Sequence, residues 1–123
     1  MSQERNDLTI YNGEQTPLAR VADSITQTQT LEDYRTGKAE NTLARQRDNI
    51  ALFESYLDEA GVHMTDMADD LRLWADVSQG LVSGFLRWQL KKSYSVGSAN
   101  VRLSTVRTYA RLAAKAGYLP TTA

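Results

Sequence analysis

Residues 98–117, SANVRLSTVRTYARLAAKAG, constrain the fold most, because a strongly periodic helical pattern coincides there with a concentration of positive charge. Ser98 is a favourable N-cap, and Gly117 stands where a helix can end in the left-handed conformation, with Pro120 just beyond it. At about 100° per residue, one narrow face collects small and apolar side chains: Ala99, Leu103, Val106, Tyr109, Ala110 and Ala113. We therefore predict one helix over 98–117 that buries this face.

The basic residues of this predicted helix fall into two sets. Arg102 lies in the first turn, near the edge of the apolar face. Arg107, Arg111 and Lys115 follow one another four residues apart on the opposite face. A helix that combines a basic flank with free N–H groups at its start has the two features that attract a phosphate backbone.

The net charge of −1 hides an uneven distribution of charge along the chain. No Asp or Glu follows Asp76, whereas seven Lys or Arg residues do. Such a difference between the two halves favours a polyanionic partner for the C-terminal part. The alternative is that the acidic front of the chain pairs internally with the basic back.

Composition excludes several classes of protein and site. With 123 residues, of which 41% are hydrophobic, the chain can bury one core. It has no cysteine, and His63 is its one histidine, so disulfides, thiolate metal sites and multi-histidine sites are excluded. The polar start is unlike a signal peptide, and no apolar run approaches the roughly 20 residues that span a bilayer. We expect a soluble, cytoplasmic protein without a cofactor or a membrane partner.

The first part of the chain has scattered apolar residues without a sustained period. We interpret 1–30 as a flexible extension that contains at most one short helix after Pro17, and 31–35 as a short helical piece stopped by Gly37. Asn41 is then expected to cap a helix over 41–60 that closes at Gly61. Its core stripe carries Leu43, Ile50, Phe53 and Leu57, with the polar Gln46 on the same stripe.

The middle of the chain predicts a short helix over 67–74 and a longer one over 78–92. Asp66, Asp69 and Asp70 lack the glycine and the distal glutamate of a calcium loop, and we interpret them as helix-start charges. Ser78 caps the longer helix, on which Val77 and Val82 have the spacing of a hydrophobic staple. Two apolar rows follow along this helix, one of Leu81, Phe85 and Trp88 and the other of Val82, Leu86 and Leu90, while Gly84 permits close approach of another helix. The chain is thus predicted to be an all-α bundle.

At this point the sequence resembles the N-terminal core-binding domain of tyrosine recombinases, the phage-integrase family. The resemblance covers about 31–120 and is carried by Asn41-Thr42-Leu43, Ile50, Phe53, Leu57, Trp74, Val77, Val82, Phe85, Leu86, Ser98, Leu103-Ser104-Thr105-Val106-Arg107 and Gly117. It departs from the family pattern at Gln46, commonly Tyr, and at Ala99, commonly Ile. The resemblance implies a SAM-like four-helix bundle over 31–120, with 121–123 as a tail that leads to an absent catalytic domain.

In that family the bundle clamps one face of duplex DNA while the catalytic domain clamps the other. The resemblance implies DNA contacts from one set of residues on each of two helices: Thr42, Arg45 and Asp48 on the first, and Gly97, Ser98, Val101, Arg102 and Thr105 on the last. Charge adds Lys91 and Lys92 in the turn between helices, and Arg107. The alternatives are that Arg102 lies over the edge of the core with its charge in water, and that Arg107, Arg111 and Lys115 form a solvated face.

The expected function is that of a DNA-binding domain from a site-specific recombinase, which is not itself an enzyme. Its expected partners are double-stranded DNA, a C-terminal catalytic domain and neighbouring recombinase protomers. Family chemistry needs a tyrosine nucleophile with arginines, and Tyr94, Tyr109 and Tyr118 lack such surroundings in the sequence. The sequence also has no glycine-rich phosphate loop and no metal ligand set. A helical protein–protein interaction module is the alternative function.

Overall fold

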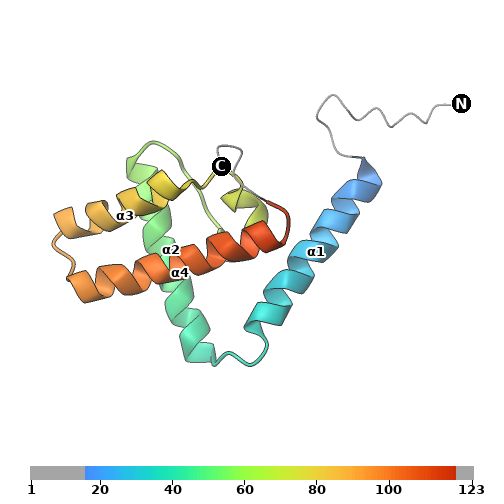
Figure 1. Ribbon diagram of the computed structural model, residues 1–123, viewed down its shortest axis with the longest axis horizontal. Coiled ribbons are helices and arrows are strands. Elements are labelled where there is room, and N and C mark those ends of the chain that lie inside the picture. The colour runs from blue at the N-terminus through green and yellow to red at the C-terminus, as the bar shows by residue number, and fades with distance from the viewer. Residues whose placement is uncertain (1–15, 119–123) are drawn as a thin grey trace, which may run out of the picture.

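The computed structural model describes residues 16–118. These form four α-helices and one short 3-10 helix, with no strand among them: α1 (Pro17–Arg35), α2 (Glu40–Glu59), η2 (Leu71–Trp74), α3 (Gln79–Lys91) and α4 (Val96–Lys115). In Figure 1, α4 crosses α2, and α3 lies beside the first half of α4. Helix α1 is inclined away from the other helices. Helix α4 contacts all four other elements. The expected all-α architecture is confirmed.

Aromatic side chains from three elements form the centre of the core. The rings of Phe53 and Trp74 stack with centroids 5.6 Å apart, and Phe85 meets Phe53 edge to face at 5.1 Å. The Trp74 indole N–H donates to the Met67 carbonyl at 2.8 Å, so its one polar group is satisfied inside the core. The predicted core is confirmed for the residues that are buried, namely Ile50, Phe53, Leu57, Phe85, Leu103 and Val106.

The remaining predicted core positions are less buried than expected. Leu81 and Trp88 pack against the core while staying partly exposed, and Leu43 lies outside the core cluster in the first turn of α2. On α3 the second predicted apolar row is not buried along its whole length, because Leu90 is exposed. The fully buried position in that turn is instead Gln89, because Val82, Phe85 and Gln89 lie on one face at helical spacing.

The helix ends follow the predicted residues in part. Ser78 caps α3 and its hydroxyl accepts from the Leu81 N–H, while Gly37, Gly61 and Gly117 all have positive φ where a helix has ended. Two predicted caps are wrong. Helix α2 already begins at Glu40, so Asn41 lies inside it, and α4 begins at Val96 because the Ser95 hydroxyl accepts from the Ser98 N–H.

Helix α1 is longer than the sequence suggested. Thr16 caps it by accepting from the Ala19 N–H, and the helix runs without a break from Pro17 to Arg35. The short helix after Pro17 and the piece at 31–35 are therefore one element, and the expected boundary at residue 30 lies within it. The rest of the expected extension, 1–15, and the expected tail at 121–123 lie outside the described residues.

Helix α1 turns its polar side to the bundle, which explains why it shows no core periodicity. Gln27 accepts from the Leu71 N–H, and the Asp23 carbonyl accepts from the Tyr118 hydroxyl. On the opposite side three large apolar side chains face solvent: Leu18 is 79% exposed, Val21 55% and Ile25 62%. Burial of apolar side chains on α1 is confined to its end, at Leu31.

The Asp69 carboxylate joins α1 and α2 to the segment before η2. Arg47 donates to both of its oxygens at 2.7 and 2.9 Å, and Arg35 donates at 2.9 Å and also to the Ala68 carbonyl. Asp69 is thus an ion-pair centre, and its expected role as a helix-start charge is wrong. Asp70 does have that role, because its carboxylate accepts from the Arg72 N–H and caps η2.

Gly84 lets α3 approach α2, and we predict that Gly84→Ala lowers the free energy of unfolding by about 1–3 kcal/mol. An added Cβ would lie 2.3 Å from the Tyr56 hydroxyl, which donates to the Leu81 carbonyl at 3.0 Å. In a Tyr56→Phe background the same exchange should be neutral or stabilising, since Ala favours a helix over Gly by about 1 kcal/mol. Urea titration of the four proteins measures both effects, and an equal cost in the two backgrounds would contradict a clash with the hydroxyl.

The second prediction concerns the effect of low pH on the stability that Asp69 contributes. Hydrogen bonds from Arg47 and then Arg35 lower the pKa of Asp69 below its ordinary value. A lowered pKa in the folded state adds stability at neutral pH that disappears as the pH falls from about 4 through the lowered pKa. At pH 7 we expect the free energy of unfolding of the wild-type chain to exceed that of Asp69→Asn by about 1 kcal/mol or less. The difference is small because the carboxylate is half exposed. Urea titrations at pH 7 and pH 3 should show this advantage shrinking, and a constant difference would contradict it.

Candidate nucleic-acid interface

A surface groove of about 450 Å³ lies between α2 and the start of α4. Its walls are formed by residues from two parts of the chain that are about fifty positions apart: Arg45, Asp48 and Asn49 on α2, and Gly97, Ser98, Val101 and Arg102 on α4. All of these residues except Asn49 are among the contact residues that the resemblance implies. We call this surface the Arg102 groove.

Polar side chains fix the two helices that form the Arg102 groove. Asn49 donates to the Thr105 hydroxyl at 3.0 Å, and that hydroxyl also lies 3.3 Å from the Val101 carbonyl of its own helix. Deeper in the bundle, the side-chain nitrogen of Gln46 donates to the Tyr34 hydroxyl at 2.8 Å, and the Tyr109 hydroxyl lies 3.5 Å from the side-chain oxygen of Gln46. The amide at position 46 therefore bridges α1, α2 and α4.

Arg102 is held in the groove by two neighbours. Its guanidinium donates to the side-chain oxygen of Gln89 at 3.3 Å and lies over the Tyr94 ring, 4.6 Å from the centroid. Gln89 is itself completely buried, and its amide nitrogen donates to the Ala99 carbonyl at 3.3 Å. A guanidinium has five N–H donors, so donors remain for a ligand while the side chain is already oriented.

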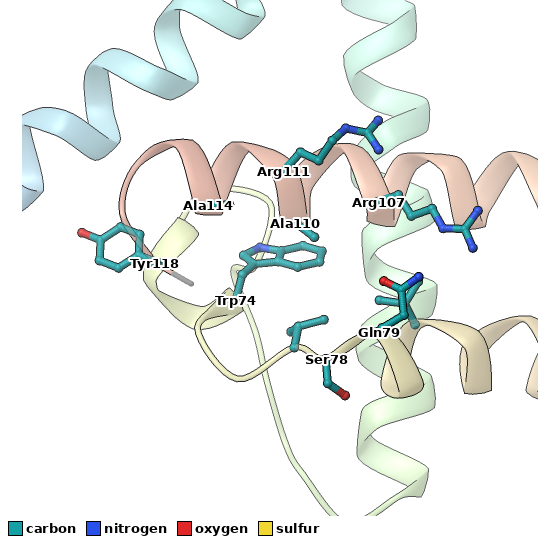
Figure 2. Close-up of a pocket in the computed structure, with 10 residues that line it drawn as sticks. Trp74, Ser78, Gln79, Arg107, Ala110, Arg111, Ala114 and Tyr118 are labelled. Atoms are coloured by element: carbon teal, nitrogen blue, oxygen red, sulfur yellow. The ribbon is translucent and has the colours of Figure 1, made fainter. Parts of the chain in front are cut away.

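The other predicted contact residues do not line the Arg102 groove. Thr42 is exposed in the first turn of α2 and does not line it. Thr105 is only 7% exposed and joins helices, so its side chain is not presented to a ligand. Lys91 is exposed at the end of α3, and beside it Lys92 pairs with Glu59 at 2.9 Å. Arg107 lines a different groove on the other side of α4 (Figure 2).

Carboxylates in the part of the chain that the structure describes leave most of the C-terminal bases without an ion pair. Within residues 16–118, Lys92 alone among the seven C-terminal bases forms an ion pair with a carboxylate. The hydrogen bond from Lys92 correspondingly lowers the pKa of Glu59. Pairing among residues 16–118 therefore does not account for the division of charge, and Arg102 forms no ion pair within this range that would keep it from an anionic ligand.

Three side chains that shape the site were missed by sequence reasoning. Asn49 and Tyr94 carry no periodic pattern that distinguishes them from surface residues. Gln89, in contrast, stands four residues after Phe85 on the buried face of α3, so the spacing could have identified it as an interior polar residue. A buried amide needs partners, and this requirement points towards the neighbouring Arg102.

Burial raises the pKa of three tyrosines, Tyr109, Tyr56 and Tyr118. A raised pKa disfavours the phenolate form of these three side chains. In residues 16–118 no cluster of His, Asp and Glu could hold a metal ion. None of the helices in this range is long and apolar enough to cross a membrane.

Comparison of the chain with models of known protein families, with curated proteins and with solved structures finds no match.

We predict that Gln89→Met releases the Arg102 side chain. Met keeps the length of the buried side chain but cannot accept the hydrogen bond, so the order parameter of the Arg102 Nε–H should fall in ¹⁵N relaxation measurements. The free energy of unfolding should drop by about 1–2 kcal/mol. Arg107 has no contact with Gln89 and serves as the internal control. An unchanged order parameter at Arg102 would mean that Gln89 does not orient it.

Proposed function

We propose that this chain binds duplex DNA through the Arg102 groove. The observation that carries the proposal is that two helices, distant in sequence, place Arg45 and Arg102 on either side of a groove at the N-terminus of α4. No acidic residue lies in the first turn of α4, so its free N–H groups and positive dipole end add to the two guanidinium charges.

The groove also has side chains that can discriminate bases. Arginine can pair with the edge of guanine in the major groove, and a carboxylate such as Asp48 can accept from the amino group of cytosine. Val101 is 61% exposed at the same surface and offers an apolar contact for a thymine methyl group. Phosphate contacts by the arginines would position the duplex, and these other groups would contribute any sequence preference.

We further propose that the bundle is the SAM-like core-binding domain of a tyrosine recombinase, as the sequence resemblance implies. The all-helical structure and the position of Arg45, Asp48, Ser98, Val101 and Arg102 in one groove support this assignment. In such a protein the breaking and joining of DNA belongs to a separate catalytic domain. The domain described here would then hold one face of the duplex, act within the cytoplasm and meet neighbouring protomers on the DNA.

A helical protein–protein interaction module is the second candidate function. It is favoured by the outward face of α1, where Leu18, Val21 and Ile25 together form an apolar stripe on the side away from the bundle. A stripe of three side chains is smaller than a stable protein interface requires. It would suit an additional contact better than a principal one, so the DNA-binding proposal is preferred.

Fluorescence anisotropy with a labelled duplex tests the proposed function. We expect weak binding whose affinity falls with salt, with a log–log slope of about −3.6 to −4.5 for four or five neutralised phosphates. Arg45→Gln and Arg102→Gln should each weaken binding by about 1–3 kcal/mol. Lys115→Gln removes the same charge from α4 at a position outside the groove and should cost well under about 1 kcal/mol.

The melting temperature of each variant separates loss of binding from loss of fold. Absence of binding at low salt by the folded wild-type chain would favour the protein-interaction module instead. A larger cost for Arg111→Gln than for Arg102→Gln, in folded variants, would place the duplex against the other side of α4.

A further inference from the structure

A second groove, of about 580 Å³, lies between the C-terminal half of α4, η2 and the start of α3. Figure 2 shows Ala110 on α4 facing the indole of Trp74, with Arg107 and Arg111 extending from the same helix. Val82 and Ala114 add to the apolar lining. We call this surface the Arg107 groove.

The Arg107 groove combines apolar walls with uncompensated positive charge. Neither Arg107 nor Arg111 forms an ion pair within residues 16–118, and no Asp or Glu lines the groove. The start of α3 also lies here, capped by Ser78 and without an acidic residue in its first turn. A phosphate backbone could pair with the guanidinium groups but would make no contact with the apolar walls. The matching occupant is an acidic peptide segment that carries large apolar side chains.

The chain itself contains such a segment immediately before α1. Residues 4–14, ERNDLTIYNGE, have three acidic residues against one arginine, together with three large apolar side chains, Leu8, Ile10 and Tyr11. Their sign of charge is opposite to that of the groove, and their apolar content matches its lining.

The helix to which this segment is attached, α1, contacts a residue that lines the Arg107 groove. Tyr118 lines the groove, and its hydroxyl donates to the Asp23 carbonyl of α1 at 3.4 Å. Asp23 follows Thr16 by seven residues, which is about 10 Å along a helix. The segment before Thr16 can span up to about 50 Å when extended. Tethering at this distance gives an effective concentration in the millimolar range, so a weak contact is enough for occupancy.

We propose that residues 4–14 bind in the Arg107 groove of the same molecule. The carboxylates of Glu4, Asp7 and Glu14 would meet the guanidinium groups of Arg107 and Arg111, and the apolar side chains of the segment would lie against the groove walls. This interaction is independent of DNA binding at the Arg102 groove, and its test needs no DNA.

Paramagnetic relaxation enhancement in the full chain tests the proposal. The sequence has no cysteine, so Ser2→Cys gives one attachment site for a nitroxide label, two positions before the segment and fifteen positions before Pro17. We expect selective broadening of the Ala110, Ala114 and Gln79 amide signals. The amides of Ser55 and His63, on a different surface of the molecule, should remain sharp.

Charge variants in the labelled chain examine the cause of any broadening. Arg107→Gln with Arg111→Gln should abolish it, as should Asp7→Asn with Glu14→Gln. Lys115→Gln, which removes a positive charge one turn beyond Arg111 without lining the groove, should preserve it. The amide spectrum of each variant shows whether it is folded.

Three results would overturn the proposal. The first is the absence of broadening at the groove in the labelled wild-type background. The second is broadening that survives the double arginine variant, because charge pairing would then not hold the segment. The third is broadening seen only when spin-labelled chain is mixed with ¹⁵N-labelled chain, because the segment would then bind a second molecule.

Discussion

The arrangement of the helices depends on burial of the Trp74 indole. Its ring stacks on Phe53 of α2 and lies 6.1 Å from the ring of Tyr109 on α4, so one side chain from a short 3-10 helix joins the two longest packed helices. Each aromatic pair is worth about 0.5–1.5 kcal/mol beyond the area it buries. Because η2 contributes this ring, the segment between α2 and α3 is part of the core, and it forms one wall of the Arg107 groove.

Helix α4 presents a different chemistry on each of its sides. Its buried side meets the aromatic core through Leu103, Val106 and Tyr109. The side towards α2 carries Arg102 in a polar groove, and the side towards α3 and η2 carries Arg107 and Arg111 over apolar walls. Since successive residues are about 100° apart on a helix, arginines five residues apart necessarily reach different surroundings. The total charge of the helix therefore says less about a ligand than the position of each charge.

The sequence predicted most of the buried framework, because apolar periodicity reports burial directly. The stripe of α4, the pair Phe53 and Phe85, and the cap at Ser78 follow from local pattern alone. Helix α1 could not be recognised in the same way, because it turns polar side chains such as Gln27 to the bundle and its apolar ones to solvent. The start of α4 was misplaced by one turn because Ser95 and Ser98 are both good caps, and only the tertiary structure selects between them. The resemblance predicted most of the residues that line the Arg102 groove. The orientation of the Arg102 side chain by Gln89 and Tyr94 could not be predicted, because it depends on tertiary contacts.

The two grooves differ in how their arginines are prepared for a ligand. Arg102 already lies against a buried amide and an aromatic ring, so ordering it on binding costs little of the side-chain entropy that a free arginine would lose. Among residues 16–118, Arg107 has no such support, and Arg111 has a contact with the Thr108 hydroxyl of its own helix. A preorganised guanidinium suits a ligand with a fixed pattern of acceptors, such as a base edge or a phosphate in a regular duplex. Guanidinium groups that lie over apolar walls without such support suit an adaptable ligand that combines carboxylates with apolar side chains.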